Sequence, residues 1–157
     1  MTQQFPAARI QLAEQASSRL MAAMLRLERS IELEEHLHHL LSLRASQING
    51  CAFCIDMHWK DARAAGETEE RLYALDAWRE SPLYDGRERA ALELCEAMTL
   101  ISEGHVPDEV WEPASEVLGD EVADVVFAVA AINTWNRLMI TTRAEPGHYQ
   151  AGMLAAA

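Results

Sequence analysis

Apolar side chains recur along the chain at the three- and four-residue spacing of amphipathic helices. Alternating runs of Val, Ile and Thr, which mark strands, do not occur in the sequence. The pattern predicts an all-α fold, a compact multi-helix arrangement that forms a single domain over residues 1–157. The expected helices cover residues 8–29, 32–48, 51–65, 68–80, 86–103, 108–118 and 120–142.

Residues typical of helix ends separate these segments. Four glycines each follow a predicted helix, where a left-handed residue commonly closes it: Gly50, Gly66, Gly104 and Gly119. Thr68 and Asp108 stand where N-caps are expected. Pro113 predicts a kink or a restart inside the helix over 108–118.

The charge balance narrows the choice of partners. Thirteen Lys and Arg against 25 Asp and Glu give a net charge of −12, spread along the chain. Such a field repels phosphate backbones and anionic lipid, so we expect no nucleic acid or membrane partner. The N-terminus lacks the pattern of a secretory signal, and the most apolar run, 122–132, is shorter than the ~20 residues that span a bilayer. The sequence therefore predicts a cytoplasmic protein.

Candidate chemistry is concentrated in SQINGCAFCIDMH, residues 46–58. On a helix that begins near residue 51, 100° per residue places Cys51, Cys54 and His58 within an arc of ~60°. Residues three apart on a helix have Cα atoms ~5 Å apart, which permits a disulfide that can open and close. The geometry predicts a reversible redox pair.

Two devices would lower the thiol pKa values in this segment. Gly50 should end one helix and leave Cys51 in the first turn of the next, where free N–H groups stabilise a thiolate. His58, one turn beyond Cys54, can accept the proton of that thiol. The helix dipole thus favours Cys51 as the first nucleophile and the histidine favours Cys54, so the order of attack stays open.

Zinc binding, haem attachment and an inert place in the core are the alternative roles for the pair. A structural zinc site needs about four ligands, and the second pair would come from Cys95 or from scattered histidines at 36, 38, 39, 105 and 148, since no second Cys-x-x-Cys exists. Covalent haem is excluded because Ile55, not histidine, follows Cys54. Inert core cysteines are the remaining alternative. We expect no metal and no cofactor.

The stretch LRASQINGCAFCIDMH, together with AVAAINTWNRLMI at residues 128–140, resembles the alkylhydroperoxidase D-like branch of the carboxymuconolactone decarboxylase family. The resemblance implies a peroxidase or disulfide reductase that acts on small hydroperoxides, with Cys54 attacking, His58 relaying protons and Cys51 resolving. It also implies an external dithiol, lipoyl or thioredoxin-like reductant. A homo-oligomer, either a dimer, a trimer or a hexamer, is expected from this resemblance and from the surplus of apolar helix surface.

One position departs from the family pattern. Relatives often carry a relay glutamate twelve residues before the first cysteine, and here that position is His39. A histidine can pass protons but is not a permanent anion. His38 is predicted to point away from His36 and His39, with His39 alone turned toward the cysteines and the group binding no metal.

Several polar or reactive residues sit on apolar helices. Cys95 lies on an apolar stripe and is expected in the core. Asn133, Asn136 and Arg137 interrupt an apolar helix, so structural hydrogen bonds are expected, with substrate binding as the alternative. Two further functions stay open for the chain: a non-redox lactone decarboxylase- or isomerase-like enzyme, and a zinc-stabilised helical binding module.

Overall fold

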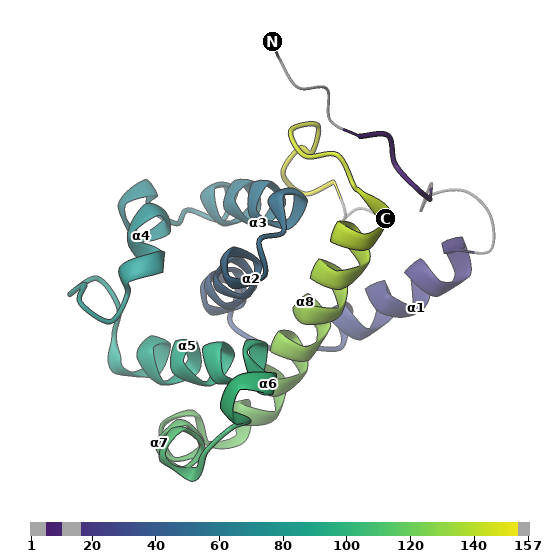
Figure 1. Ribbon diagram of the computed structural model, residues 1–157. Coiled ribbons are helices and arrows are strands. Elements are labelled where there is room, and N and C mark those ends of the chain that lie inside the picture. Colours follow the sequence, from purple (N-terminus) through teal and green to yellow (C-terminus); the bar gives the residue numbers. More distant parts are fainter. Residues whose placement is uncertain (1–5, 11–16, 154–157) are drawn as a thin grey trace.

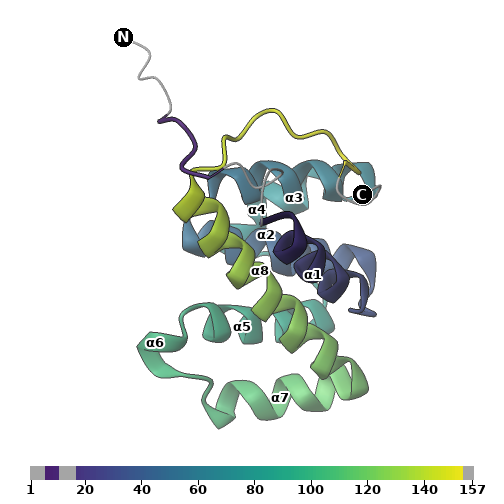
Figure 2. The same cartoon turned by 90° about the vertical axis from the view of Figure 1, so that its right-hand side faces the viewer.

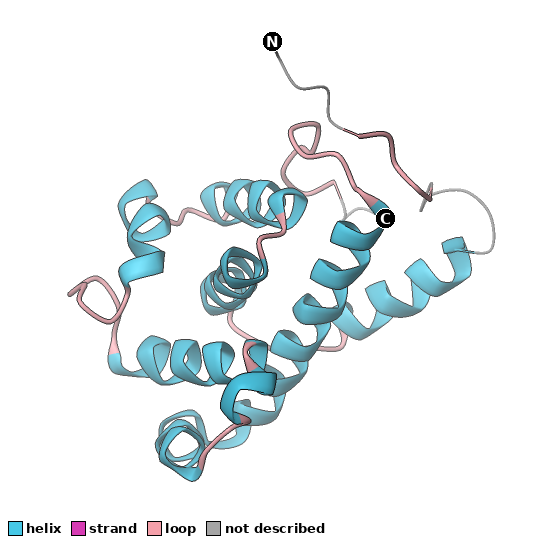
Figure 3. Ribbon diagram, in the orientation of Figure 1, coloured by secondary structure: helices cyan, strands magenta, loops and turns pink. Residues whose placement is uncertain are grey.

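The computed structural model describes residues 6–10 and 17–153, and these contain helices, turns and loops but no strand (Figure 3). The all-α prediction is therefore confirmed. The helices in chain order are α1 Ser17–Arg29, α2 Glu35–Asn49, α3 Ala52–Ala64, α4 Glu69–Ala74, η1 Leu75–Ala77, α5 Gly86–Thr99, α6 Ile101–Gly104, α7 Asp108–Leu118, η2 Gly119–Glu121 and α8 Val122–Thr142.

Helix α2 is the centre of the fold. It packs against α3, α5 and α8, and Figure 1 shows it between α3 and α5 with α8 alongside. Its leucines Leu37, Leu40, Leu41 and Leu43 are almost completely buried. Burying each such side chain stabilises the fold by roughly 1.5–3 kcal/mol, so this helix anchors the elements that carry the cysteines.

The corner between α2 and α3 follows from Gly50. This residue adopts a left-handed conformation, with φ 68° and ψ 33°, and its N–H bonds back to the carbonyl of Gln47. The next residue, Cys51, donates its N–H to the carbonyl of Ser46 at 3.0 Å and forms the N-cap of α3. The predicted glycine cap is thus confirmed, and it turns the chain so that α3 starts beside the end of α2.

The predicted helix over 8–29 is wrong at its start. Residues 8–10 are not helical, and residues 11–16 lie outside the described part of the chain. Arg9 instead bonds to the end of α8: its N–H donates to the carbonyl of Thr142 at 2.9 Å, and its guanidinium donates to the carbonyl of Thr141 at 3.1 Å. These tertiary bonds take the place of helical ones.

Two predicted helices are shorter than expected. The one over 86–103 breaks at Leu100, whose ψ of 32° leaves the helical region and separates α5 from α6. The one over 68–80 gives α4 and η1, followed by turns after Ala77. Its predicted N-cap is confirmed, because the Thr68 hydroxyl accepts from the N–H of Arg71 at 3.2 Å.

Other end signals are corrected near α7. Gly104 is the last residue of α6, and His105 takes the positive φ of 59° in its place. Pro107, not Asp108, occupies the N-cap position, so Asp108 contributes only its charge to the first turn. The helix passes through Pro113 without restarting. Gly66 and Gly119 do have positive φ values, 98° and 56°.

Helix α1 lies against α8, as two views at right angles show (Figures 1 and 2). Its apolar side chains are only partly covered, and Leu20 and Leu27 are exposed.

Among the described residues, no helix combines the length and apolar character that a membrane crossing requires.

Candidate functional site

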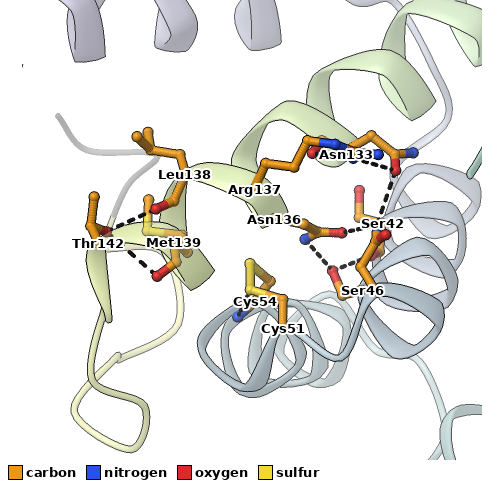
Figure 4. Close-up of a disulfide and its surroundings, with 11 residues drawn as sticks. Ser42, Ser46, Cys51, Cys54, Asn133, Asn136, Arg137, Leu138, Met139 and Thr142 are labelled. Carbon is orange, nitrogen blue, oxygen red and sulfur yellow. Dashed lines mark hydrogen bonds between the residues drawn. A yellow bond between two sulfur atoms is a disulfide. The ribbon is translucent and has the colours of Figure 1, made fainter. Parts of the chain in front are cut away.

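The two cysteines of the motif form a disulfide at the N-terminus of α3 (Figure 4). Their Cα atoms are 5.3 Å apart, and both residues are almost completely buried beside Met139 of α8. Cys51 is the N-cap itself, one position before the expected first turn, and its Sγ accepts from the N–H of Cys54 at 3.3 Å. Both sulfur atoms thus lie at the positive end of the α3 dipole.

A layer of side-chain amides, of which Asn136 is buried and Asn49 and Asn133 are partly buried, fixes this corner against α8. Asn136 is fully buried; its amide donates to the Ser46 hydroxyl at 3.0 Å and its carbonyl oxygen accepts from Asn49 at 2.8 Å. Asn49 also donates to Asn133 at 2.9 Å. The expected structural bonding of these asparagines is confirmed, whereas Arg137 is exposed and bonds only back to Asn133 in its own helix among the described contacts.

A pocket of about 440 Å³ opens beside the disulfide. Cys54 contributes to its wall, and Cys51 does not. Most of the wall is apolar, and a smaller set of ionisable side chains interrupts it. The lining residues are Leu25, Glu28, Arg29, His38, Phe53, Cys54, Met57, His58, Asp61, Ile132, Trp135 and Met139.

His58 lies in this wall on the same helix as Cys54. Both of its ring nitrogens are buried, and neither has a hydrogen-bond partner among the described residues. Burial, reinforced by the neighbouring His38 and His39, lowers the pKa of His58 to about 3. The ring is therefore neutral at pH 7, so that one nitrogen carries a proton and the other is an acceptor.

The prediction for the histidines of α2 is wrong for His38. His38 lines the pocket, whereas His39 lies beside the wall with its ring centroid 6.5 Å from that of His58. The His38 and His39 rings are stacked, with centroids 6.4 Å apart. The side chains of His38 and His39 differ by about 100° in direction around the axis of α2. Because α2 packs along α3, both side chains nevertheless reach the region of His58.

Burial is the main cause of the pKa shifts of His38 and His39. Burial, and then the charge of His39, lowers the pKa of His38 to about 4. Burial also lowers the pKa of His39, although Asp61 and Glu35 oppose the effect. The Nε2 atom of His39 is 3.8 Å from a carboxylate oxygen of Glu35, and this carboxylate is 73% exposed.

Glu28, on the last turn of α1, is the residue that sequence reasoning missed. Its Oε1 accepts from the indole N–H of Trp135 at 2.8 Å, and its Oε2 is 3.6 Å from the Nε2 of His38. Burial raises the pKa of Glu28, and the Trp135 bond opposes this only in part. A single glutamate on an amphipathic helix carries no sequence signal that distinguishes it from a solvated one.

Two further features of the described residues are the lack of a candidate metal cluster and the position of the third cysteine away from the pocket. No group of three or more His, Cys, Asp or Glu side chains within residues 6–10 and 17–153 is arranged to hold a metal ion. Cys95 is fully buried in the main core, as predicted, and burial raises the pKa of its thiol to about 12.

Comparison with known proteins supports this reading of the fold. Residues 14–97 match the model of the carboxymuconolactone decarboxylase family. YdfG of Bacillus subtilis strain 168, an uncharacterized protein, is 51% identical over 102 residues, which are 64% of this chain and 69% of YdfG.

Solved structures share the architecture. ATU0492 of Agrobacterium tumefaciens, a protein of unknown function described as a candidate antioxidant defence protein AhpD, superposes with a TM-score of 0.85 at 40% identity. The match covers 91% of this chain and 100% of that one. An uncharacterized peroxidase-related protein from Silicibacter sp. TM1040 has the same fold, with a TM-score of 0.74 at 19% identity over 87% of this chain and 75% of its own.

Proposed function

Because the chain belongs to the carboxymuconolactone decarboxylase family, with an AhpD-like fold, we propose that it is a thiol-dependent peroxidase or disulfide oxidoreductase. The observation that carries the proposal is a closed Cys51–Cys54 disulfide of which only Cys54 lines the pocket. A substrate in the pocket therefore meets one sulfur, with the second within bonding reach.

The proposed cycle has three balanced steps. The Cys54 thiolate attacks one oxygen of a hydroperoxide and the O–O bond breaks, so that the sulfur becomes a sulfenic acid. The departing alkoxide takes up the proton that the Cys54 thiol had released and leaves as the alcohol. The Cys51 thiol then condenses with the sulfenic acid, which forms the disulfide and releases water. An external dithiol, such as a lipoyl group or a thioredoxin-like protein, reduces the disulfide and is itself oxidised.

The place of each sulfur relative to the pocket supports the assignment of roles, since Cys54 is among the lining residues and Cys51 is not. The dipole of α3 favours a thiolate at both sulfurs, and the N–H of Cys54 bonds to the Cys51 sulfur, which stabilises Cys51 as the thiolate that leaves when the disulfide is reduced. Neutral His58 in the same wall can accept a proton. The apolar remainder of the wall suits a hydroperoxide with an organic substituent.

Thiol counting tests the proposal. Reduced protein treated with one equivalent of an organic hydroperoxide should lose two thiols per chain. Cys51→Ser should lose one and form a sulfenic acid that dimedone traps, and Cys54→Ser should react far more slowly. An unchanged thiol count in the wild type would exclude the redox cycle and favour the non-redox, decarboxylase-like alternative; fast reaction of Cys54→Ser would reverse the roles of the two cysteines.

We also propose that the chain forms a homo-oligomer. Phe127 and Ile140 of α8 and Leu20 of α1 are large apolar side chains that are about half exposed or more. Burial of such side chains against a second copy is favourable. Light scattering at micromolar concentration should give a mass of at least two chains, and a mass of one chain would refute the proposal.

A further inference from the structure

Two methionine side chains share the pocket wall with Cys54. Met57 lies three positions after Cys54 on α3, so both side chains lie on the same side of that helix. Met139 comes from α8, is only 8% exposed and packs in one cluster with both cysteines. Because both methionines line the cavity, its wall contains two thioether side chains besides Cys54.

Met57 is the more open of the two methionines. Its side chain is partly buried, and it packs against neither of the two clusters of buried core residues in the described part of the chain. The cavity of about 440 Å³ that it lines is of a size typical of small-molecule pockets, roughly 300–1,000 Å³. A molecule in this cavity can therefore contact Met57 without displacing core residues.

A thioether reacts with a hydroperoxide without help from a base. Its sulfur lone pair attacks the terminal oxygen, the O–O bond breaks, the sulfur becomes a sulfoxide, and the proton of the hydroperoxide leaves with the alcohol. The sulfur is oxidised and the peroxide is reduced, so no further reductant takes part. A cysteine must be reduced and ionised to attack, whereas a methionine can react in either state of the disulfide.

We propose that Met57 is a second peroxide-reactive sulfur of this pocket, and that it takes up oxygen from an organic hydroperoxide while the Cys51–Cys54 disulfide is closed. This rests on the proposed function in one respect, namely that an organic hydroperoxide enters the pocket. With the disulfide closed, neither cysteine has a thiolate that can attack the peroxide. Met57 is then the more accessible thioether of the wall, since Met139 is packed against the cysteines.

Oxidation of Met57 changes the pocket that receives the hydroperoxide. A sulfoxide is polar, and it would stand in a wall to which Leu25, Phe53 and Ile132 contribute side chains without hydrogen-bonding groups. The oxidised pocket should therefore bind an apolar hydroperoxide less well. The modification would slow peroxide uptake until a methionine sulfoxide reductase restores the thioether.

The test uses the disulfide-closed protein and an organic probe. The protein is treated with cumene hydroperoxide, and the sulfoxide at each methionine is measured by peptide mapping and mass spectrometry. Met57 should be oxidised about tenfold faster than Met98, because binding in the pocket raises the local concentration of the peroxide. Met98 is the matched control, since it is also partly buried but packs against the main core and does not line the pocket.

Two comparisons separate binding from exposure. Hydrogen peroxide has no apolar substituent that the pocket could hold, so with this probe Met153, which is 57% exposed, should be oxidised first. Cumyl alcohol resembles the organic probe in shape but has no O–O bond. An excess of this alcohol should protect Met57 from cumene hydroperoxide and leave the oxidation of Met153 unchanged.

Met57→Leu tests the consequence for the pocket, because leucine keeps an apolar side chain of similar volume. Both proteins are first treated with cumene hydroperoxide, and the disulfide is then reduced. The pretreatment should slow the later loss of thiols to hydroperoxide in the wild type and leave the rate of the variant unchanged. Equal slowing of the two proteins would show that oxidation at another residue alters the pocket.

The other outcomes also overturn the proposal. Equal oxidation of Met57 and Met98 by cumene hydroperoxide would show that the pocket does not bring the peroxide to Met57, and a lack of protection by cumyl alcohol would show that the attack comes from solvent. Oxidation of Met139 ahead of Met57 would assign the reactive sulfur to α8. Since the sulfoxides are measured with the disulfide closed, failure of the peroxidase proposal would be visible separately in the thiol count of the reduced protein.

Discussion

Because the buried ring of His58 has no hydrogen-bond partner among the described residues, we expect the unfolding free energy to fall at acid pH. This can be measured on the protein with its disulfide closed. The folded protein keeps His58 neutral down to about pH 3, whereas in the unfolded chain the ring takes up a proton below its ordinary pKa of about 6.5. The unfolded state binds more protons throughout this window. The unfolding free energy must therefore fall as the pH falls from 6.5 toward 3.

The size of the effect follows from the two pKa values. Between pH 7 and pH 5, the proton uptake of an unfolded histidine whose folded form stays neutral removes about 2 kcal/mol of stability. His38, with a pKa of about 4, adds a similar amount over the same interval. Together they remove a substantial part of the 5–15 kcal/mol that is typical of a domain.

His58→Phe isolates the first contribution. Phenylalanine fills the same wall with an apolar ring, and it removes two buried nitrogen atoms that have no partner. We expect the variant to match or exceed the wild type at pH 7 and to be about 2 kcal/mol more stable than it at pH 5, by urea denaturation followed by circular dichroism.

A control on an exposed histidine completes the experiment. His148→Phe changes a ring that is 81% exposed, and its curve of stability against pH should run parallel to that of the wild type. Parallel curves for His58→Phe and the wild type would refute the reasoning, because they would mean that His58 is protonated or solvated in the folded state.

Three further predictions concern other parts of the molecule. Glu96→Ala should lower the unfolding free energy by about 3–5 kcal/mol, because it leaves Arg44 and Trp78 without their shared acceptor; a loss below 1 kcal/mol in urea denaturation would contradict this. Gly50→Ala should lower the unfolding free energy by about 1 kcal/mol through its left-handed φ alone, since no described atom beyond its two chain neighbours lies within 4 Å of the added Cβ; a stability equal to that of the wild type would show that the turn relaxes. In the reduced native protein, a thiol reagent should leave Cys95 unmodified until denaturant is added, and native labelling of Cys95 by mass spectrometry would show that its core opens.

Local signals predicted the helical core well. Gly50 set the corner between α2 and α3 because a left-handed φ is a property of the residue itself, and the cysteine spacing set the disulfide because α3 begins where it was expected. Arg9 shows the limit of such reasoning. Its segment has helical spacing, yet bonds to the distant end of α8 decide its conformation.

The sequence predicted which site residues lie close together only where they belong to the same helix. Cys54 and His58 share α3, so that periodicity alone brings them to one face. His38 was assigned to the wrong face because helical spacing gives angles about one axis but not the direction from which α3 crosses. Glu28 reaches the pocket through the packing of α1 on α8, and its separation of 107 positions from Trp135 hides this contact from any local pattern.

The asparagine layer between α2 and α8 has a consequence for the local motions of the pocket. The backbone at Cys51 is tied to Ser46 and, through Asn136, to the middle of α8, so its amides should be among the slowest to exchange with deuterium. Helix α1 packs chiefly on one neighbour and keeps exposed apolar residues, so its amides should exchange early. We therefore expect the wall that holds the sulfur atoms to be more rigid than the wall that α1 contributes. A molecule that enters the pocket should displace α1 first, and the distance between the two sulfur atoms should not depend on its length.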